Sequence, residues 1–251
     1  MTEVNYLESL NPLQYESVCS TEGPNLIIAG AGTGKTKVLT TRVAHIIDNN
    51  LAFPSQILCV TFTNKAAREM SERVQQLVSQ NMEKMPWMGT FHSIGAKIIR
   101  NHAEVIGLKQ SFTILDKDDQ LSLIKQIIKA ENLDQSQFSP KLIQSKIDHW
   151  KNKALNPNDI KSETLDNLAD EKSLSIYRIY QARLFEINCL DFGDLLLQCI
   201  NLFKVPDIHK RYSNNFKYIH VDEYQDTNAA QYKWLKLLGS HHQNVCCVGD
   251  D

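Results

Sequence analysis

The residue run with the clearest chemistry is Ala29-Gly30-Ala31-Gly32-Thr33-Gly34-Lys35-Thr36, whose spacing is typical of a loop that binds a nucleoside triphosphate. Its three glycines let the backbone turn and bring N–H groups against phosphate oxygens. Lys35 is placed to reach the β- and γ-phosphates, and the Thr36 hydroxyl is placed to ligate Mg²⁺. The first position holds Ala29 instead of glycine, which only narrows the allowed backbone angles. We predict a nucleotide-binding loop; the alternative is a purely structural glycine-rich turn.

A second group of candidate catalytic residues follows the apolar run 218–221, where the sequence reads Asp222-Glu223-Tyr224-Gln225-Asp226. Two acids at the end of a buried strand are costly unless a cation lies beside them. A bound Mg²⁺ would supply that charge, with Asp222 holding the metal directly or through water. Glu223 is then placed to orient and deprotonate an attacking water. The alternative is a helix N-terminus that simply carries acids.

Strands and helices must position both groups. The runs 26–28, 57–61, 218–221 and 245–248 are short and apolar, which predicts four parallel strands separated by helical patterns. We expect 26–28 to be buried. In an open α/β sheet ligands gather at the carboxyl ends of the strands, and both the glycine loop and the acids directly follow a strand. The helix after the loop adds about half a positive charge beneath the phosphates.

The segment from about 107 to 190 differs, because it has almost no strand signal and several helix starts. Apolar residues recur at helical spacing near 121–128, 142–150 and 176–187, and Ser139-Pro140 is a good start for the second of these helices. A block of this kind within an α/β chain predicts an inserted all-helical subdomain.

Composition limits the possible partners. The 251 residues carry a formal net charge of −2, so any surface for nucleic acid must be local. No apolar run approaches the roughly 18 residues of a membrane span, and the first residues do not form a signal sequence. The six cysteines show no Cys-x-x-Cys pair. We therefore expect a reduced, cytoplasmic protein without a membrane partner.

The nucleotide is expected not to be GTP. A GTPase would carry an Asn-Lys-x-Asp guanine reader, whereas the only Asn-Lys here, Asn64-Lys65, is followed by two alanines. A small-molecule kinase would rarely need an acidic pair followed by Gln225 and Asp226.

Taken in order, these motifs resemble those of superfamily 1 DNA helicases of the UvrD/Rep/PcrA type, over nearly the whole chain. Besides the glycine loop (motif I) and the acidic motif (motif II), five segments carry the resemblance. They are Leu10–Gln14 (the adenine-reading Q motif), Val60–Ala67 (motif Ia), Gly89–Ser93 (motif Ib), Asp191–Leu196 (re-entry from the insertion) and Val248–Asp251 (the start of motif III). Such an ordered set is far more specific than a phosphate loop alone.

The resemblance implies a fold and a domain organisation. It implies a RecA-like P-loop NTPase core with a parallel sheet, interrupted by the helical insertion. The expected domains are 1–106 and 191–251 for the two parts of the core and 107–190 for the insertion. It also implies that a second RecA-like domain, which carries arginine fingers, would follow motif III, where this chain stops.

The resemblance further implies ATP and Mg²⁺ as cofactors. Gln14 would contact the adenine, and the whole run from Ala29 to Thr36 would hold the phosphates. Lys37 stands where relatives often carry an arginine that packs on the adenine, and an ammonium cannot stack as a guanidinium does. The implied catalytic residues are Lys35, Asp222, Glu223 and Gln225, and the implied metal ligands are Thr36 and Asp222.

Single-stranded DNA is the partner that the resemblance implies. Phe62 is the best stacking candidate, because stacking of a base on an aromatic ring contributes ~1–3 kcal/mol and does not depend on sequence. Core packing is the alternative for it and for Phe192. Gly193 stands where the family usually has an acid. The implied DNA contacts are Phe62, Thr63, Asn64, Thr90, His92 and Phe192.

We therefore interpret the chain as the N-terminal, ATP-binding portion of a 3′→5′ DNA helicase. Such a helicase acts on single strands and duplex junctions in repair or replication. Alone, the chain is expected to bind Mg·ATP but to hydrolyse it slowly and unwind nothing, because an arginine finger contributes about 10³–10⁵ in rate. Two alternatives stay open. They are a stand-alone module that binds ATP or single-stranded DNA, and part of a helicase–nuclease of the RecB/AddA kind.

Overall fold

The computed structural model describes residues 6–78, 85–134, 137–161 and 168–250. Two expectations fall on residues outside this described part. Met1–Asn5 were expected not to form a signal sequence, and Asp251 was expected to be the last residue of the motif III start. The chain divides into two compact units: Met1–Ile94 with Pro206–Thr227 and Leu235–Asp251, and Gly95–Val205 with Asn228–Trp234. The domain limits expected at 106/107 and 190/191 stay a prediction.

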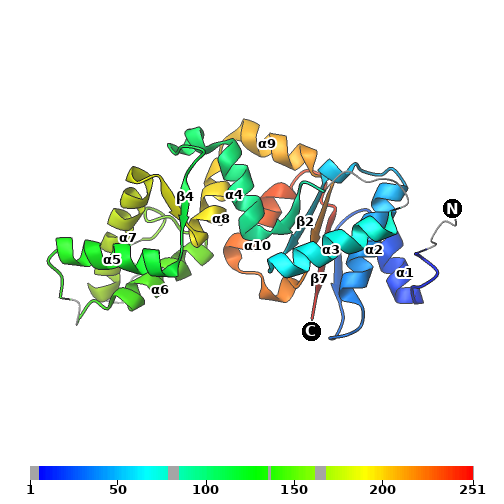
Figure 1. Cartoon of the computed structure of the whole chain (residues 1–251), viewed down its shortest axis with the longest axis horizontal. Coiled ribbons are helices and arrows are strands. Elements are labelled where there is room, and N and C mark those ends of the chain that lie inside the picture. The colour runs from blue at the N-terminus through cyan, green and yellow to red at the C-terminus, as the bar shows by residue number, and fades with distance from the viewer. Residues whose placement is uncertain (1–5, 79–84, 135–136, 162–167, 251) are drawn as a thin grey trace. The chain divides into compact units, whose positions relative to one another are not determined.

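The first unit is built on a five-stranded parallel sheet with the strand order β1-β7-β6-β2-β3. Figure 1 labels β2 and β7 of this sheet. The four strands predicted from apolar runs are confirmed. The sequence did not predict β3, because three residues with a central glycine give no apolar run. The strands are β1 (Asn25–Ile28), β2 (Ile57–Thr61), β3 (Met88–Thr90), β6 (Tyr218–Val221) and β7 (Val245–Gly249).

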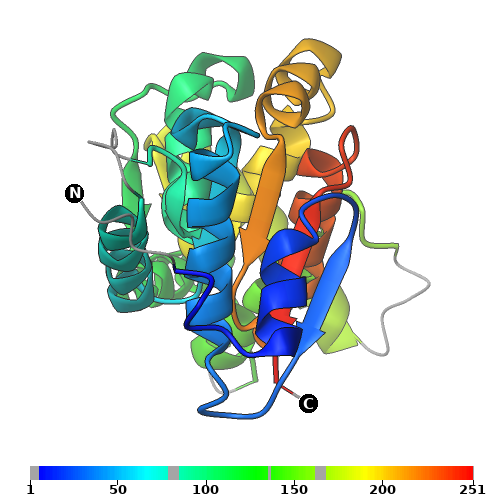
Figure 2. The same ribbon diagram turned by 90° about the vertical axis from the view of Figure 1, so that its right-hand side faces the viewer.

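Strand β1 lies at an edge of this sheet, and the expectation that 26–28 is buried is wrong. Leu26 and Ile28 are 59% and 55% exposed, whereas Ile27 packs against the core. The apolar run predicted the strand, but it could not predict that β1 has a neighbouring strand on one side only. Figure 2 shows β1 beside α1 (Pro12–Cys19), both in blue.

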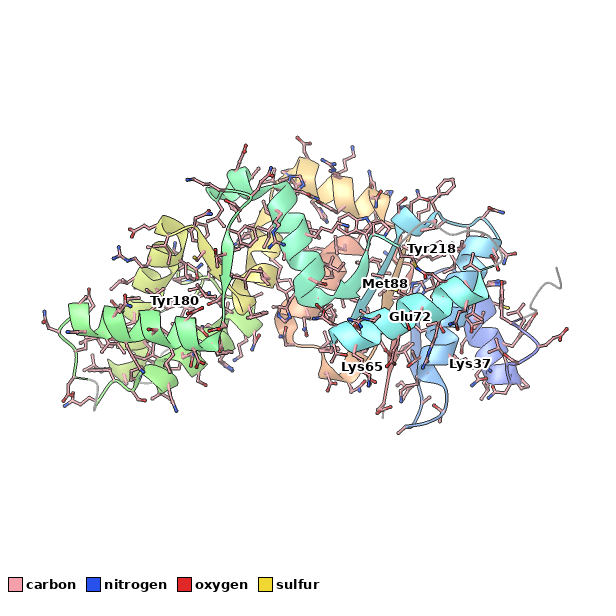
Figure 3. The ribbon with its side chains drawn as sticks, in the orientation of Figure 1. Lys37, Lys65, Glu72, Met88, Tyr180 and Tyr218 are labelled. Carbon is pink, nitrogen blue, oxygen red and sulfur yellow. The ribbon has the colours of Figure 1, made fainter. Side chains whose placement is uncertain are left out.

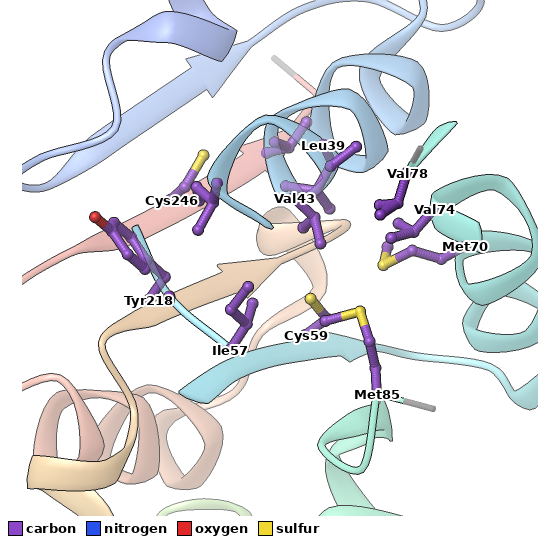
Figure 4. Close-up of a cluster of buried hydrophobic side chains, with 14 residues drawn as sticks. Leu39, Val43, Ile57, Cys59, Met70, Val74, Val78, Met85, Tyr218 and Cys246 are labelled. Atoms are coloured by element: carbon purple, nitrogen blue, oxygen red, sulfur yellow. The ribbon is translucent and has the colours of Figure 1, made fainter. Parts of the chain in front are cut away.

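Helices α2 (Lys35–Asp48) and α3 (Asn64–Leu77) pack on one face of the sheet, and their apolar side chains meet those of β2, β6 and β7 (Figure 4). Leu39, Val43 and Met70 are fully buried there, and burial of each such side chain contributes about 1.5–3 kcal/mol. Helix α9 (Pro206–Asn215) belongs to the same unit, and α4 (Phe91–Asn101) and α10 (Ala229–Leu238) span the two units.

The second unit is mainly helical, but the expectation of an all-helical insertion is wrong in one detail. Two three-residue strands, β4 (Thr113–Leu115) and β5 (Cys189–Asp191), pair in parallel. They are too short for an apolar run to distinguish them from the ends of helices. The helices are α5 (Lys117–Ala130), α6 (Pro140–Asn152), α7 (Leu168–Glu186) and α8 (Phe192–Leu202).

The core of the second unit lies between α5, α6 and α7. Ile124, Ile147 and Tyr180 are fully buried in it, and Figure 3 labels Tyr180. Among the described residues, no helix has the length and apolar character needed to cross a membrane.

Candidate nucleotide-binding site

The glycine loop connects β1 to the first turn of α2. Gly32 and Gly34 have φ angles of 78° and 89°, which residues with a Cβ rarely adopt. Gly34 is the N-cap of α2, and Thr33 closes the loop because its hydroxyl donates to the Gly30 carbonyl at 2.8 Å. The helix N-terminus, with its unpaired N–H groups, therefore lies directly after the loop, where an anion is favoured.

The Lys35 ammonium lies within this loop. It donates to the carbonyls of Ala29 and Gly30, at 2.9 and 3.1 Å, and forms an ion pair with Asp250. The Lys35 side chain is only 10% exposed. Asp250 directly follows β7, the neighbour of β1 in the sheet. The motifs gave Asp250 no individual role, although its position just after an apolar run indicates that it lies at the same edge of the sheet as the loop.

Asp222 is buried at the carboxyl end of β6, next to β7. Asp222 is 4% exposed, and its Oδ1 accepts no hydrogen bond within the described part of the chain. Burial raises the pKa of this carboxyl, Glu223 raises it further, and the Lys35 ammonium lowers it. A buried carboxylate oxygen without a donor is the environment that a bound cation stabilises.

These residues fit a Mg²⁺ ion that is held jointly with a nucleotide. No group of three or more His, Cys, Asp or Glu side chains suited to a metal occurs among the described residues. Mg²⁺ in nucleotide sites keeps several waters and takes only one or two protein oxygens besides those of phosphate. The Asp222 carboxylate and the hydroxyl of Thr36, in the first turn of α2, are the residues that would hold such an ion.

Glu223 and Gln225 form a small network beside Asp222. Glu223 has φ 52° and ψ 48°, a left-handed conformation that costs a residue with a Cβ about 1–2 kcal/mol. The Gln225 amide donates to Glu223 Oε2 at 2.6 Å, and its oxygen accepts from the Asp250 N–H at 3.1 Å. A Cβ on Gly249 would lie 2.7 Å from that oxygen, so glycine permits the approach. Gln225 thus connects the candidate base to the partner of Lys35.

A cavity of about 460 Å³ lies between α1, β1 and the glycine loop, a size suited to a small ligand. Gln14 and Lys35 line it, and Leu13 and Leu26 add apolar surface. The Gln14 amide donates to the Thr33 carbonyl at 3.0 Å, and its oxygen accepts from the Asn11 N–H at 3.1 Å. The structure therefore places Gln14 against the glycine loop.

Lys37 comes from the first turn of α2 and is exposed (Figure 3). Its ammonium donates to the Ser9 carbonyl at 2.6 Å. This bond ties α2 to the segment before α1. That Lys37 lies at the adenine stays a prediction.

The candidate DNA contacts of the first unit follow β2 and β3, which pair with Thr61 opposite Thr90. Phe62 is partly exposed, and its ring meets the edge of the Phe91 ring at 5.5 Å between centroids. Thr63 is the N-cap of α3, and its hydroxyl accepts from the Ala66 N–H at 3.1 Å. The sheet thus places both segments at one edge.

The remaining candidates differ in exposure. Asn64 is exposed at the start of α3. Thr90 is only 9% exposed, and its hydroxyl accepts from the Ser93 N–H at 3.1 Å. Burial lowers the pKa of His92, which favours a neutral ring. Phe192 belongs to the second unit, where it is 47% exposed at the start of α8.

The sequence is similar to known proteins over nearly its whole length. The profile of the UvrD/REP helicase N-terminal domain family matches residues 10–251. The chain is 48% identical to DNA helicase II of Rickettsia typhi, over 100% of this chain and 38% of that protein. It is also 48% identical to the ATP-dependent DNA helicase PcrA of Staphylococcus aureus, over 97% of this chain and 33% of that protein. The chain thus spans well under half the length of these relatives.

Proposed function

Because the chain belongs to the UvrD/REP helicase N-terminal domain family, we propose that it binds Mg·ATP at the glycine loop. One observation carries the proposal. The buried Asp222, which directly follows β6, has a carboxylate oxygen without a donor among the described residues, and the loop that leads to Lys35 follows β1 of the same parallel sheet. A lysine for the phosphates and an acid for their counter-ion therefore lie at the same edge of the sheet.

Each residue has a separate task in this proposal. The N–H groups of the loop and the Lys35 ammonium bind the phosphates, and Gln14 binds the adenine. Thr36 and Asp222 hold Mg²⁺, which neutralises phosphate charge when bound. Glu223 accepts the proton of the attacking water, and Gln225 fixes the Glu223 carboxylate through its 2.6 Å hydrogen bond.

The proposed partner is single-stranded DNA. Stacking of bases on aromatic rings and polar contacts to the sugar–phosphate backbone suit DNA binding that does not depend on base sequence. The proposed contacts are Phe62, Thr63, Asn64, Thr90, His92 and Phe192. For the whole protein we propose ATP-driven 3′→5′ movement on single strands and at duplex junctions, in the cytoplasm during repair or replication. The resemblance and the names of the relatives support this activity.

The test measures phosphate release from Mg·ATP by the purified 251-residue chain, with and without oligo(dT). We expect turnover far below an ordinary enzyme rate of ~10 s⁻¹. The chain spans well under half the length of its relatives, and the resemblance assigns the arginine finger, worth about 10³–10⁵ in rate, to a second RecA-like domain. Glu223→Gln should abolish what turnover there is while leaving ATP binding intact. DNA-stimulated turnover at the ordinary rate would show that the 251 residues suffice for catalysis.

A further inference from the structure

The second unit buries a lysine between two aspartates at the start of α8. Lys151 Nζ lies 2.7 Å from Asp191 Oδ2 and 2.8 Å from Asp194 Oδ1, and none of the three side chains is more than 3% exposed. Lys151 comes from α6, whereas Asp191 is the N-cap of α8 and Asp194 lies in its first turn. Buried charges are rare and need a paired, hydrogen-bonded environment.

The two aspartates cap the helix reciprocally. Asp191 Oδ1 accepts from the Asp194 N–H at 2.9 Å, and Asp194 Oδ2 accepts from the Asp191 N–H at 3.3 Å. This arrangement satisfies two N–H groups of the helix start, but it brings two like charges together. Burial and Asp191 raise the pKa of Asp194 to about 6, and Lys151 acts in the opposite direction. Lys151 is therefore the counter-charge that the cap requires.

Three helices converge on this cap. Besides Lys151 of α6, the Gln120 amide of α5 donates to Asp191 Oδ2 at 3.3 Å and the Tyr180 hydroxyl of α7 donates to it at 2.9 Å. The Gln181 amide of α7 donates to Asp194 Oδ1 at 3.1 Å. The start of α8 is thus fixed by side chains from α5, α6 and α7.

Gly193 makes room for the lysine. A Cβ on Gly193 would lie 2.8 Å from Lys151 Cδ and 2.9 Å from Lys151 Cβ. The lysine stem therefore occupies the space that a side chain at 193 would need. This contact explains why glycine stands where the resemblance led us to expect an acid.

Phe192 lies between the two inward-facing acids. Residues three apart in a helix share a face, so turning Asp191 and Asp194 inward turns the intervening Phe192 away from them. Phe192 is 47% exposed. We infer that Lys151 is a positioning residue, which locks the first turn of α8 and so presents the Phe192 ring to a base of single-stranded DNA. The inference rests on the proposed function in its DNA part only.

The positioning part is tested without DNA. Amide hydrogen exchange of the first turn of α8 is compared in wild type, Lys151→Met and the control Lys153→Met, an exposed lysine just past the same helix. We expect Lys151→Met to lose protection at the α8 start and Lys153→Met to retain it. Unchanged protection in Lys151→Met would overturn the inference, whatever the chain does with DNA.

The DNA part is tested by a double-mutant cycle, with fluorescence anisotropy of labelled oligo(dT). Phe192→Ala should weaken binding about 5- to 150-fold if one base stacks on the ring. Lys151→Met should weaken it too, and the double variant should lie within about twofold of Phe192→Ala alone. If the fold losses of affinity in the two single variants multiply in the double variant, Lys151 acts on DNA binding by another route. That result would overturn the inference.

Two further outcomes separate the inference from the proposed function. If Phe192→Ala binds oligo(dT) like wild type while Lys151→Met loses protection at α8, the DNA role of Phe192 is wrong and the positioning is right. If Lys151→Met does not fold, Gly193→Ala replaces it in both measurements, because the new methyl group displaces the lysine stem and leaves every charge in place. Gly193→Ala should then lose α8 protection and show the same non-additivity with Phe192→Ala; full protection would contradict the inference.

Discussion

The Lys35 ammonium of the glycine loop is paired with the carboxylate of Asp250, which directly follows β7. A triphosphate that binds the loop competes with this carboxylate for the ammonium and is repelled by its charge. We therefore expect Asp250→Asn to tighten Mg·ATP binding. The Asp250 side chain is 41% exposed, and exposed pairs contribute up to about 1 kcal/mol, so the expected gain is up to about fivefold, measured by calorimetry.

Asp207→Asn is the control for this change, since it removes the same charge from an exposed position in the first turn of α9. It should leave ATP affinity unchanged. Weaker ATP binding by Asp250→Asn would mean that the carboxylate supports the nucleotide instead of competing with it.

Gln14 is expected to give the site its preference for adenine. Replacing it with alanine removes one neutral hydrogen-bonding pair, which contributes about 0.5–1.5 kcal/mol, so the preference for ATP over GTP should fall about 2- to 12-fold. Gln56→Ala is a matched control, because the Gln56 oxygen also accepts from the N–H three residues earlier, at 3.1 Å. Competition of both nucleotides against a fluorescent ATP analogue measures the preference. An unchanged preference in Gln14→Ala would remove its adenine role.

Phe62 is expected to stack on a DNA base although its ring also touches Phe91. Phe62→Ala should weaken oligo(dT) binding about 5- to 150-fold. Phe53→Ala is the control, since Phe53 is 72% exposed in another loop of the same unit. Equal losses in both variants, or none in either, would assign Phe62 to the core.

His220 predicts a pH dependence of stability. It is 1% exposed, neither ring nitrogen has a hydrogen-bond partner among the described residues, and burial together with Arg42 lowers its pKa to about 3. The unfolded chain takes up a proton near pH 6.5 and the folded chain does not. The contribution of His220 is therefore complete above about pH 6.5 and is lost as the pH falls toward 3.

Urea unfolding of wild type and His220→Leu at about pH 7 and pH 5 tests this dependence. Between these pH values wild type should lose about 2 kcal/mol more stability than the variant. His241→Leu, at an exposed histidine, should behave like wild type. The same pH dependence in His220→Leu and wild type would show that His220 is charged in the folded protein.

The glycine loop between β1 and α2 and four strands of the first sheet could be predicted from sequence, because local spacing and short apolar runs specify them. Sequence could not predict that Asp250 pairs with Lys35, since the two residues meet only through the order of β1 and β7 in the sheet. In the sequence, Lys151 does not differ from a solvated lysine of a helix. In the structure it is enclosed by α5, α6, α7 and the start of α8. Burial of a charge is decided by tertiary packing and not by local pattern.

Trp87 illustrates the same limit. Its place after Pro86 in the sequence indicates no role. In the structure its ring meets the rings of Tyr212 and Phe216 edge-on, at 5.8 and 5.2 Å between centroids. Residues more than a hundred positions apart in sequence form this cluster, so no local pattern could show it. The resemblance pointed to Phe62 and Phe192 as DNA contacts, with core packing as the alternative for both, and the DNA contact stays a prediction.

The central claim is that the glycine loop and Lys35 bind the phosphates of ATP. A thermal melt with and without Mg·ATP, for wild type and Lys35→Ala, tests it most directly. At a hundredfold excess over Kd, binding adds about 2.7 kcal/mol, so the wild-type Tm should rise by roughly 5–10 °C and the Tm of Lys35→Ala should not rise. An equal rise in both proteins would contradict the proposed phosphate site.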